Sequence, residues 1–305
     1  MSPRALGFLC AIALVGTPRL HAQDGAVFAE DFRFGSFTRA VRIEADPFGC
    51  VYVSDAGAHT VVKYSPDGTM LATAGGQGWG IMQFDHPAGI DARLGITVYV
   101  ADRGNNRIVR LDRSLAPIGT FSTRDDPSAG LSFGDPLDVV ITKRGDLLIL
   151  DGENVRIVAT TGFTAAEKAF GGIEAGPLRL RKPVAMARSE DDRIFVLEPD
   201  RVLVFDVFGN PLFSFAYKVF EDARGIACRD DRIAVVTPTE LFLFTTEGEL
   251  LQRVARERFV FAGTTGTFED VALTGTRLYL LTAQSVLVFP RIPSLNSSED
   301  LWHTD

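Results

Sequence analysis

The sequence lacks the signatures of the common enzyme classes. It contains no Gly-x-Ser-x-Gly elbow, no His-Glu-x-x-His pair and no glycine-rich phosphate loop that opens a helix. No segment shows a convincing amphipathic helical pattern, whereas apolar runs of four to six residues, cut by Gly, Asp and Asn, are frequent. Such runs favour strands over helices.

Positive charge is also in short supply. The chain has 31 Lys and Arg against 39 Asp and Glu, a net charge of −8. Nucleic-acid binding needs a basic surface, so we expect no nucleic-acid partner. After the first 22 residues, no apolar run approaches the ~20 residues of a membrane-spanning helix, so we expect no membrane span.

What the chain does have is a repeated short strand that ends at a polar residue opening a turn. The six end residues are separated by 47, 49, 47, 39 and 45 positions, a period that is typical of propeller blades. The six strands are Val51 to Asp55, Val98 to Asp102, Leu147 to Asp151, Ile194 to Glu198, Ile233 to Thr237 and Leu278 to Thr282.

Each period divides into four short strands, so the sequence predicts an all-β, six-bladed propeller with four-stranded antiparallel blades. The last unit lacks a convincing fourth strand, and the segment Ala26 to Phe32 reads like one. We therefore expect this N-terminal strand to complete the last blade and close the ring. The predicted blades span residues 34–80, 81–127, 128–176, 177–220, 221–258, and 259–290 together with 26–33, within one domain over 23–292.

The two ends of the chain have a different character. Residues 1–22 combine Arg4, an apolar stretch and a small residue at Ala22, which predicts a signal peptide cleaved after Ala22 and hence a secreted or periplasmic protein. Cleavage removes two Arg and no acidic residue, leaving a net charge of −10. The polar segment 293–305 is predicted to be a flexible tail.

Few cysteines remain after that cleavage. Cys50 and Cys228 fall in the first and fifth units, which are not neighbours in a six-membered ring. Their Cα atoms should therefore lie beyond the ~7 Å that a disulfide tolerates. We expect two buried free thiols.

The second unit carries the most regular version of the repeat. It has a glycine-rich loop at residues 75–80, then Phe84, Pro87-Ala88-Gly89-Ile90, the strand Val98 to Asp102 and Asn106-Arg107-Ile108. These features resemble the NHL repeats, a six-bladed propeller family. The first unit shares the strand and turn, and units three to six keep the period but lose much of the motif. The resemblance implies a fold whose members include adhesive, scaffolding and enzymatic proteins.

Alignment of the units on their second strands predicts the lining of the central channel. Residues near the start of each first strand share one face with the turns after the second strands, and their side chains should converge at a central mouth. An alternative is that their opposite charges only pair at a solvated rim. The predicted mouth residues are Arg39, Arg42, His86, Asp135, Asp138, Lys182, Asp222, Arg224, Glu269 and Asp270.

Metal binding on the channel axis is a separate question, because the resemblance includes lyases and hydrolases with a divalent metal there. One axial histidine, His86, cannot alone make the nitrogen-rich site that zinc favours. Asp138, Glu269 and Asp270 could supply oxygens suited to Ca²⁺. His59 occupies a turn position where the repeat often carries Asn or His, and we expect Asp55, Asp102 and Asp151 to cap turns.

Two functions therefore stand at this point. The favoured one is an exported, non-catalytic propeller that binds a protein, peptide or glycan at its loop-bearing face and central mouth, without a cofactor. The alternative is a metal-assisted lyase or lactone hydrolase acting on the axis.

Overall fold

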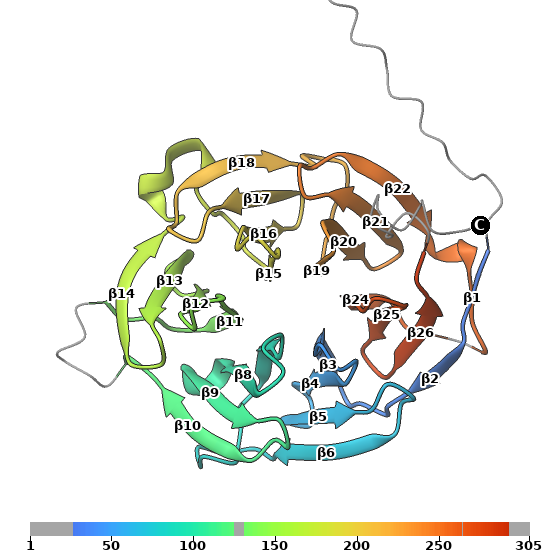
Figure 1. Cartoon of the computed structure of the whole chain (residues 1–305), viewed down its shortest axis with the longest axis horizontal. Coiled ribbons are helices and arrows are strands. Elements are labelled where there is room, and N and C mark those ends of the chain that lie inside the picture. The colour runs from blue at the N-terminus through green and yellow to red at the C-terminus, as the bar shows by residue number, and fades with distance from the viewer. Residues whose placement is uncertain (1–26, 125–130, 264, 293–305) are drawn as a thin grey trace, which may run out of the picture.

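Short strands arranged in a ring dominate the computed structural model, which describes residues 27–124, 131–263 and 265–292. Six antiparallel four-stranded sheets surround a central axis, with the first strand of each sheet innermost and the fourth outermost (Figure 1). The predicted all-β, six-bladed propeller is confirmed. The predicted signal peptide, residues 1–22, and the predicted tail, residues 293–305, lie outside the described residues.

The blades follow one another along the chain. Blade 1 contains β3 (Ala40–Ala45), β4 (Val51–Asp55), β5 (Thr60–Tyr64) and β6 (Met70–Gly75). Blade 2 contains β7 (Pro87–Asp91), β8 (Thr97–Asp102), β9 (Arg107–Asp112) and β10 (Pro117–Phe121). Blade 3 contains β11 (Pro136–Ile141), β12 (Leu147–Asp151), β13 (Arg156–Thr161) and β14 (Ala165–Phe170).

The second half repeats the pattern. Blade 4 contains β15 (Ala185–Arg188), β16 (Ile194–Glu198), β17 (Arg201–Phe205) and β18 (Pro211–Phe215). Blade 5 contains β19 (Gly225–Arg229), β20 (Arg232–Thr237), β21 (Glu240–Thr245) and β22 (Leu250–Ala255). Blade 6 contains β24 (Phe268–Leu273), β25 (Arg277–Thr282), β26 (Val286–Pro290) and β2 (Phe32–Phe34).

Helix is limited to three short 3₁₀ segments in the described residues: η1 (Arg103–Asn105), η2 (Ile173–Leu178) and η3 (Arg256–Arg258). None of the helices there has the length and apolar character needed to cross a membrane.

The ring closes through the N-terminal segment, as predicted, but farther along the chain than expected. Strand β2 pairs antiparallel with β26, with Phe32 opposite Val288 and Phe34 opposite Val286. The preceding residues form β1 (Phe28–Ala29), which pairs in parallel with β23 (Phe259–Val260) instead. Two separate pairings therefore attach this segment to the last part of the chain.

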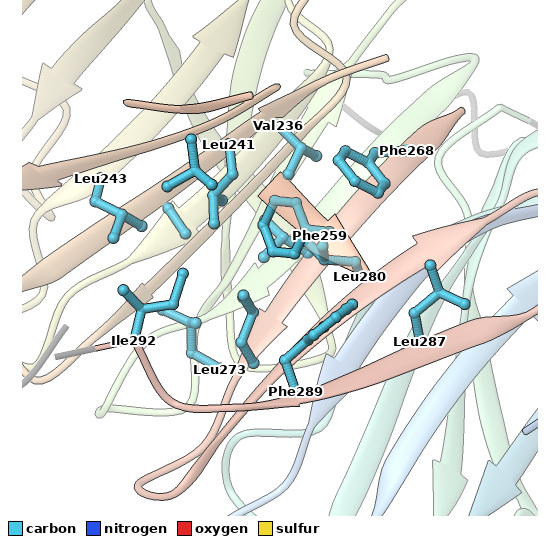
Figure 2. Packing of buried hydrophobic residues seen from close by; sticks show 14 residues of the cluster. Val236, Leu241, Leu243, Phe259, Phe268, Leu273, Leu280, Leu287, Phe289 and Ile292 are labelled. Carbon is cyan, nitrogen blue, oxygen red and sulfur yellow. The ribbon is translucent and has the colours of Figure 1, made fainter. Parts of the chain in front are cut away.

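The hydrophobic core is divided among the six junctions between blades. Strand β4 and its equivalents β8, β12 and β16 are buried along their whole length, because a neighbouring blade covers each of their faces. Outer strands such as β6 expose most of their residues. At the junction of blades 5 and 6, Phe259 of β23 packs among Phe268, Leu280 and Phe289 (Figure 2). Burying one such side chain contributes about 1.5–3 kcal/mol.

Acidic residues at the ends of second strands fix the loops that lead to the channel. Asp55 accepts backbone N–H bonds from Gly57 and Ala58 of its own turn, as predicted, and also from Thr38 and Arg39 before β3. One carboxylate thus holds the turn and the incoming loop together. Asp151 likewise binds the N–H groups of Asn154 in its turn and of Gly134 in the incoming loop.

The two cysteines of the described residues are free, as predicted, but only partly buried. Cys50 lies at the end of the turn before β4, and Cys228 lies in β19. The expectation of burial was wrong, because Cys228 lies in a first strand and lines a hollow of the channel, whereas Cys50 lies in the turn between β3 and β4.

Candidate functional site

One end of the central channel opens into a hollow of about 640 Å³, here called the mouth cavity. Its lining comes from blades 1 to 4, so it is not symmetric about the axis. The lining residues are Arg39, Val41, Arg42, Ala56, His86, Pro87, Ala88, Arg103, Gly104, Asp135, Leu137, Pro183 and Val184. Four of the ten predicted mouth residues, namely Arg39, Arg42, His86 and Asp135, are therefore brought together here.

The other predicted rim residues lie outside this lining. Arg224 forms ion pairs with Glu269 (Nη1 to Oε1, 2.7 Å) and with Asp222 (Nη2 to Oδ2, 3.3 Å). Lys182 is exposed, and its backbone N–H is held by Glu198. On the side of blades 5 and 6, the opposite charges therefore pair with each other at the rim, as the alternative prediction held.

Arg42 forms the floor of the mouth cavity. Its guanidinium leaves blade 1 and donates hydrogen bonds to the carbonyl oxygens of Val184 in the loop before β15 and of Arg224 in the loop before β19 (3.1 Å to Arg224). Its Nε lies 3.7 Å from Asp138 Oδ2. A second arginine, Arg93, crosses below from blade 2 to the carbonyl of Arg188. Between these two side chains, the channel narrows to a hollow of only about 10 Å³.

Asp138 and Asp270 lie in this narrow part and connect neighbouring blades. Asp138 accepts the N–H of Met186 in blade 4 (2.8 Å), and Asp270 accepts that of Ile43 in blade 1 (2.9 Å). Asp91, which was not predicted, does the same for Ile141 in blade 3 (3.0 Å). These carboxylates therefore act as inter-blade clamps.

Burial controls the ionisation of these clamps. Desolvation raises the pKa of Asp270 to about 7, although Arg42 and the bound N–H groups oppose the shift. It also raises the pKa of Asp138, again against the attraction of Arg42. The pKa of a carboxylate rises in this way when the cost of removing its water exceeds the stabilisation that its new partners provide.

The carboxylates predicted to bind an axial Ca²⁺ interact instead with other groups of the protein. Asp138 and Asp270 face backbone N–H groups, whereas Glu269 pairs with Arg224. Within the described ranges, these three do not come together as a group of metal ligands.

Two residues were missed from the sequence, Arg103 in the lining of the mouth cavity and His59 next to the lining residue His86. Arg103 of η1 forms a bidentate pair with Asp135, with Nε to Oδ1 at 2.6 Å and Nη2 to Oδ2 at 3.0 Å. His59 lies against His86, with ring centroids 4.6 Å apart. Both residues come from turns after second strands. Alignment of the repeats placed these turns on the mouth face but did not show which of their side chains approach the cavity.

Charge in the mouth cavity is unequally matched. Arg103 and Asp135 neutralise each other, and Arg42 is committed to carbonyl oxygens. Arg39 is exposed, and no carboxylate among the described residues pairs with it. The cavity therefore offers an uncompensated guanidinium.

Comparison with solved structures agrees with the fold. Virginiamycin B lyase from Staphylococcus aureus matches with a TM-score of 0.54 at 13% identity, over 90% of this chain and 97% of that one. A gluconolactonase from Xanthomonas campestris gives 0.58 at 14% identity, over 89% and 93%. A chain of a mitotic checkpoint complex gives 0.61 at 11% identity, over 95% and 99%.

No protein-family model matches the chain, so the resemblance to NHL repeats stays a prediction. At identities this low, likeness between structures shows the fold alone. The proteins that share this fold include two enzymes and a member of an assembly, and the fold therefore does not select among functions. The chain folds as a six-bladed β-propeller.

Proposed function

We propose that this protein is an exported, non-catalytic binding module whose mouth face takes a protein, peptide or glycan through a carboxylate group of that ligand. The observation that carries the proposal is Arg39, which lines the mouth cavity together with Arg42 and has no carboxylate partner in the described part of the chain. A guanidinium recognises a carboxylate through paired, charge-assisted hydrogen bonds.

The surroundings of the cavity support a ligand larger than a metabolite. The loop between β6 and β7 lies on the mouth face and exposes Trp79 by 73%, Ile81 by 49% and Met82 by 42%. Arg107 holds the backbone of this loop at the carbonyls of Trp79, Gly80 and Gln83. A fixed loop with an exposed Trp is typical of interaction surfaces.

Binding, rather than catalysis, fits the roles of the buried acids. Asp138 and Asp270 would be the acids of an axial site, yet both hold neighbouring blades. Export rests on the predicted signal peptide. Mass spectrometry of the protein isolated from its host would test it, since a mature chain that starts at Gln23 is expected.

The binding proposal is tested on arrays of acidic peptides and uronate-containing oligosaccharides, each with an amide or neutral counterpart. We expect carboxylate-dependent binding that weakens in salt and falls about tenfold or more in Arg39→Ala, the loss of one charged hydrogen-bonding group. Arg144→Ala is the matched control, because Arg144 lies in the β11–β12 turn at the other end of the channel. Binding that is equal in the two variants would contradict the proposal.

The alternative function is a metal-assisted lyase or lactone hydrolase on the axis. The likeness to virginiamycin B lyase and to a gluconolactonase supports it. Its test is lactone hydrolysis by the purified protein with and without a chelator. If the protein with one bound metal ion hydrolyses a lactone and a chelator stops the reaction, the enzymatic function would be accepted in place of the binding function.

A further inference from the structure

A cluster of His59, Asp85 and His86 lies where blades 1 and 2 meet at the mouth. His59 comes from the β4–β5 turn, and the other two precede β7. Asp85 Oδ1 lies 3.3 Å from His59 Nδ1 and 2.8 Å from His86 Nδ1. One ligand atom from each residue fits within 4.8 Å of the others.

The carboxylate of Asp85 is held with one oxygen toward the imidazoles. Gly104 donates its N–H to the Asp85 carbonyl (2.8 Å), and Asp102 accepts the Asp85 N–H (2.7 Å). A Cβ on Gly104 would lie 2.5 Å from Asp85 Oδ2, so this oxygen packs against bare backbone. Oδ1 is buried and has no hydrogen-bond partner among the described residues, despite its closeness to both rings.

This arrangement differs from ordinary hydrogen bonding. A donor and acceptor 2.8 Å apart should be aligned, but the Asp85 Oδ1 contact with His86 is not a hydrogen bond. Atoms that bind one metal ion have a different arrangement, because the lone pair of each atom points at the ion that lies between them. Zinc bonds of about 2.0–2.1 Å place tetrahedral ligand atoms roughly 3.3 Å apart.

We propose that His59, Asp85 and His86 bind one divalent transition-metal ion of the zinc type. Two imidazoles and one carboxylate favour such an ion over Ca²⁺ or Mg²⁺, which prefer oxygen ligands. Three protein ligands leave a coordination position open, and His86 lines the mouth cavity. The site does not depend on the proposed function, since no mouth ligand takes part in it.

A structural role for His59 is the competing explanation. Its Nδ1 accepts the backbone N–H of His86 at 3.1 Å, which alone would account for a histidine at this turn. The same bond requires the lone pair to be on Nδ1, the form in which histidine binds metals. Metal binding through Nδ1 would require this lone pair to face the ion instead of the His86 N–H.

The test is a titration of the tag-free protein, first treated with a chelator, with Zn²⁺ alone in a calorimeter at neutral pH. We expect one equivalent bound with a dissociation constant of roughly micromolar or tighter. Millimolar Ca²⁺ should neither bind nor compete. Co²⁺ should give a visible absorption band that Zn²⁺ removes.

Variants separate the two explanations. Both histidines have positive φ, 58° at His59 and 51° at His86, and Asn tolerates this conformation. Asn106, the equivalent of His59 in blade 2, has φ 50°. His59→Asn/His86→Asn should therefore fold normally, with an unchanged melting temperature in chelator, and should bind Zn²⁺ at least tenfold more weakly. His303→Asn is the control for nonspecific histidine binding.

Two results would overturn the proposal. One is the absence of saturable Zn²⁺ binding by the wild-type protein, and the other is Zn²⁺ binding by the double variant that matches the His303→Asn control. Asp85→Asn is a second variant, because its amide keeps the shape of the carboxylate but removes its charge. It should lower the affinity without affecting the melting temperature in chelator.

Discussion

The rim and the narrow middle of the channel contain similar charged residues that do different work. At the rim, Arg224 pairs with Asp222 and Glu269 in contact with solvent. In the middle, Asp138 and Asp270 are buried and hold N–H groups of the next blade. Depth therefore decides whether a charged residue only forms ion pairs at the surface or also holds neighbouring blades together, because an unpaired charge is costly only where water is excluded.

The largest difference in stability between the rim and the narrow middle should come from removing one acidic side chain in the middle. Asp138→Ala leaves the Met186 N–H without its acceptor and Arg42 without its nearby anion. We expect a loss of about 3–5 kcal/mol in the free energy of unfolding, measured in urea. Arg224→Ala at the rim should cost roughly 0–1 kcal/mol. Equal losses would contradict the difference between rim and middle.

The second contrast concerns pH. Asp270 has a pKa of about 7 in the folded protein, above its ordinary value of 3.8. The folded state therefore holds the proton more tightly, and stability is lost as pH rises from about 4 to about 7. Asp270→Asn cannot ionise, so its stability relative to wild type should increase over this range by a few kcal/mol, on the order of 1.4 per pKa unit.

Unfolding in urea at pH 5 and pH 8 measures this effect. A rim variant, Glu269→Gln, is the control, since the side chain of Glu269 is partly exposed and paired with Arg224. The proposed role of burial at Asp270 would be rejected by a pH dependence that is the same in wild type and Asp270→Asn.

The smallest contrast tests how tightly the clamps pack. A Cβ on Gly89 would lie 2.0 Å from Asp138 Oδ1 and 2.4 Å from its Cα, whereas one on Gly275 would meet no atom of the described residues within 4 Å. Gly89→Ala should therefore lower the free energy of unfolding by about 1–3 kcal/mol. Gly275→Ala should leave the melting temperature nearly unchanged. Tolerance of Gly89→Ala would mean that the clamp can move.

Much of the fold was predictable because a blade is a local unit. The strand from Val98 to Asp102 and the turn after it lie within a few residues of each other, so spacing and turn chemistry identify them. The mouth position of Arg39 and His86 followed from the same register. The closing strand was found but misplaced, because Phe28 and Phe32 both carry strand-like sequence and only their partners, β23 and β26, distinguish them.

Contacts between blades were not predictable in the same way. Arg42 reaches blades 4 and 5, and the direction of such a long side chain depends on the space left by residues far away in the sequence. His59 meets His86 only because the β4–β5 turn of one blade lies beside the loop that enters the next. The sequence indicated one histidine at the mouth, and packing between blades supplies the second.

The closing strand has a consequence for the order of folding. Because β2 pairs with residues 286–288, the sixth blade cannot form until nearly all of the described chain has been synthesised. Five blades can assemble earlier. Until the sixth blade forms, β2 has no partner strand. Ring closure is thus the contact with the longest sequence separation, and we expect it to be the slow, final step.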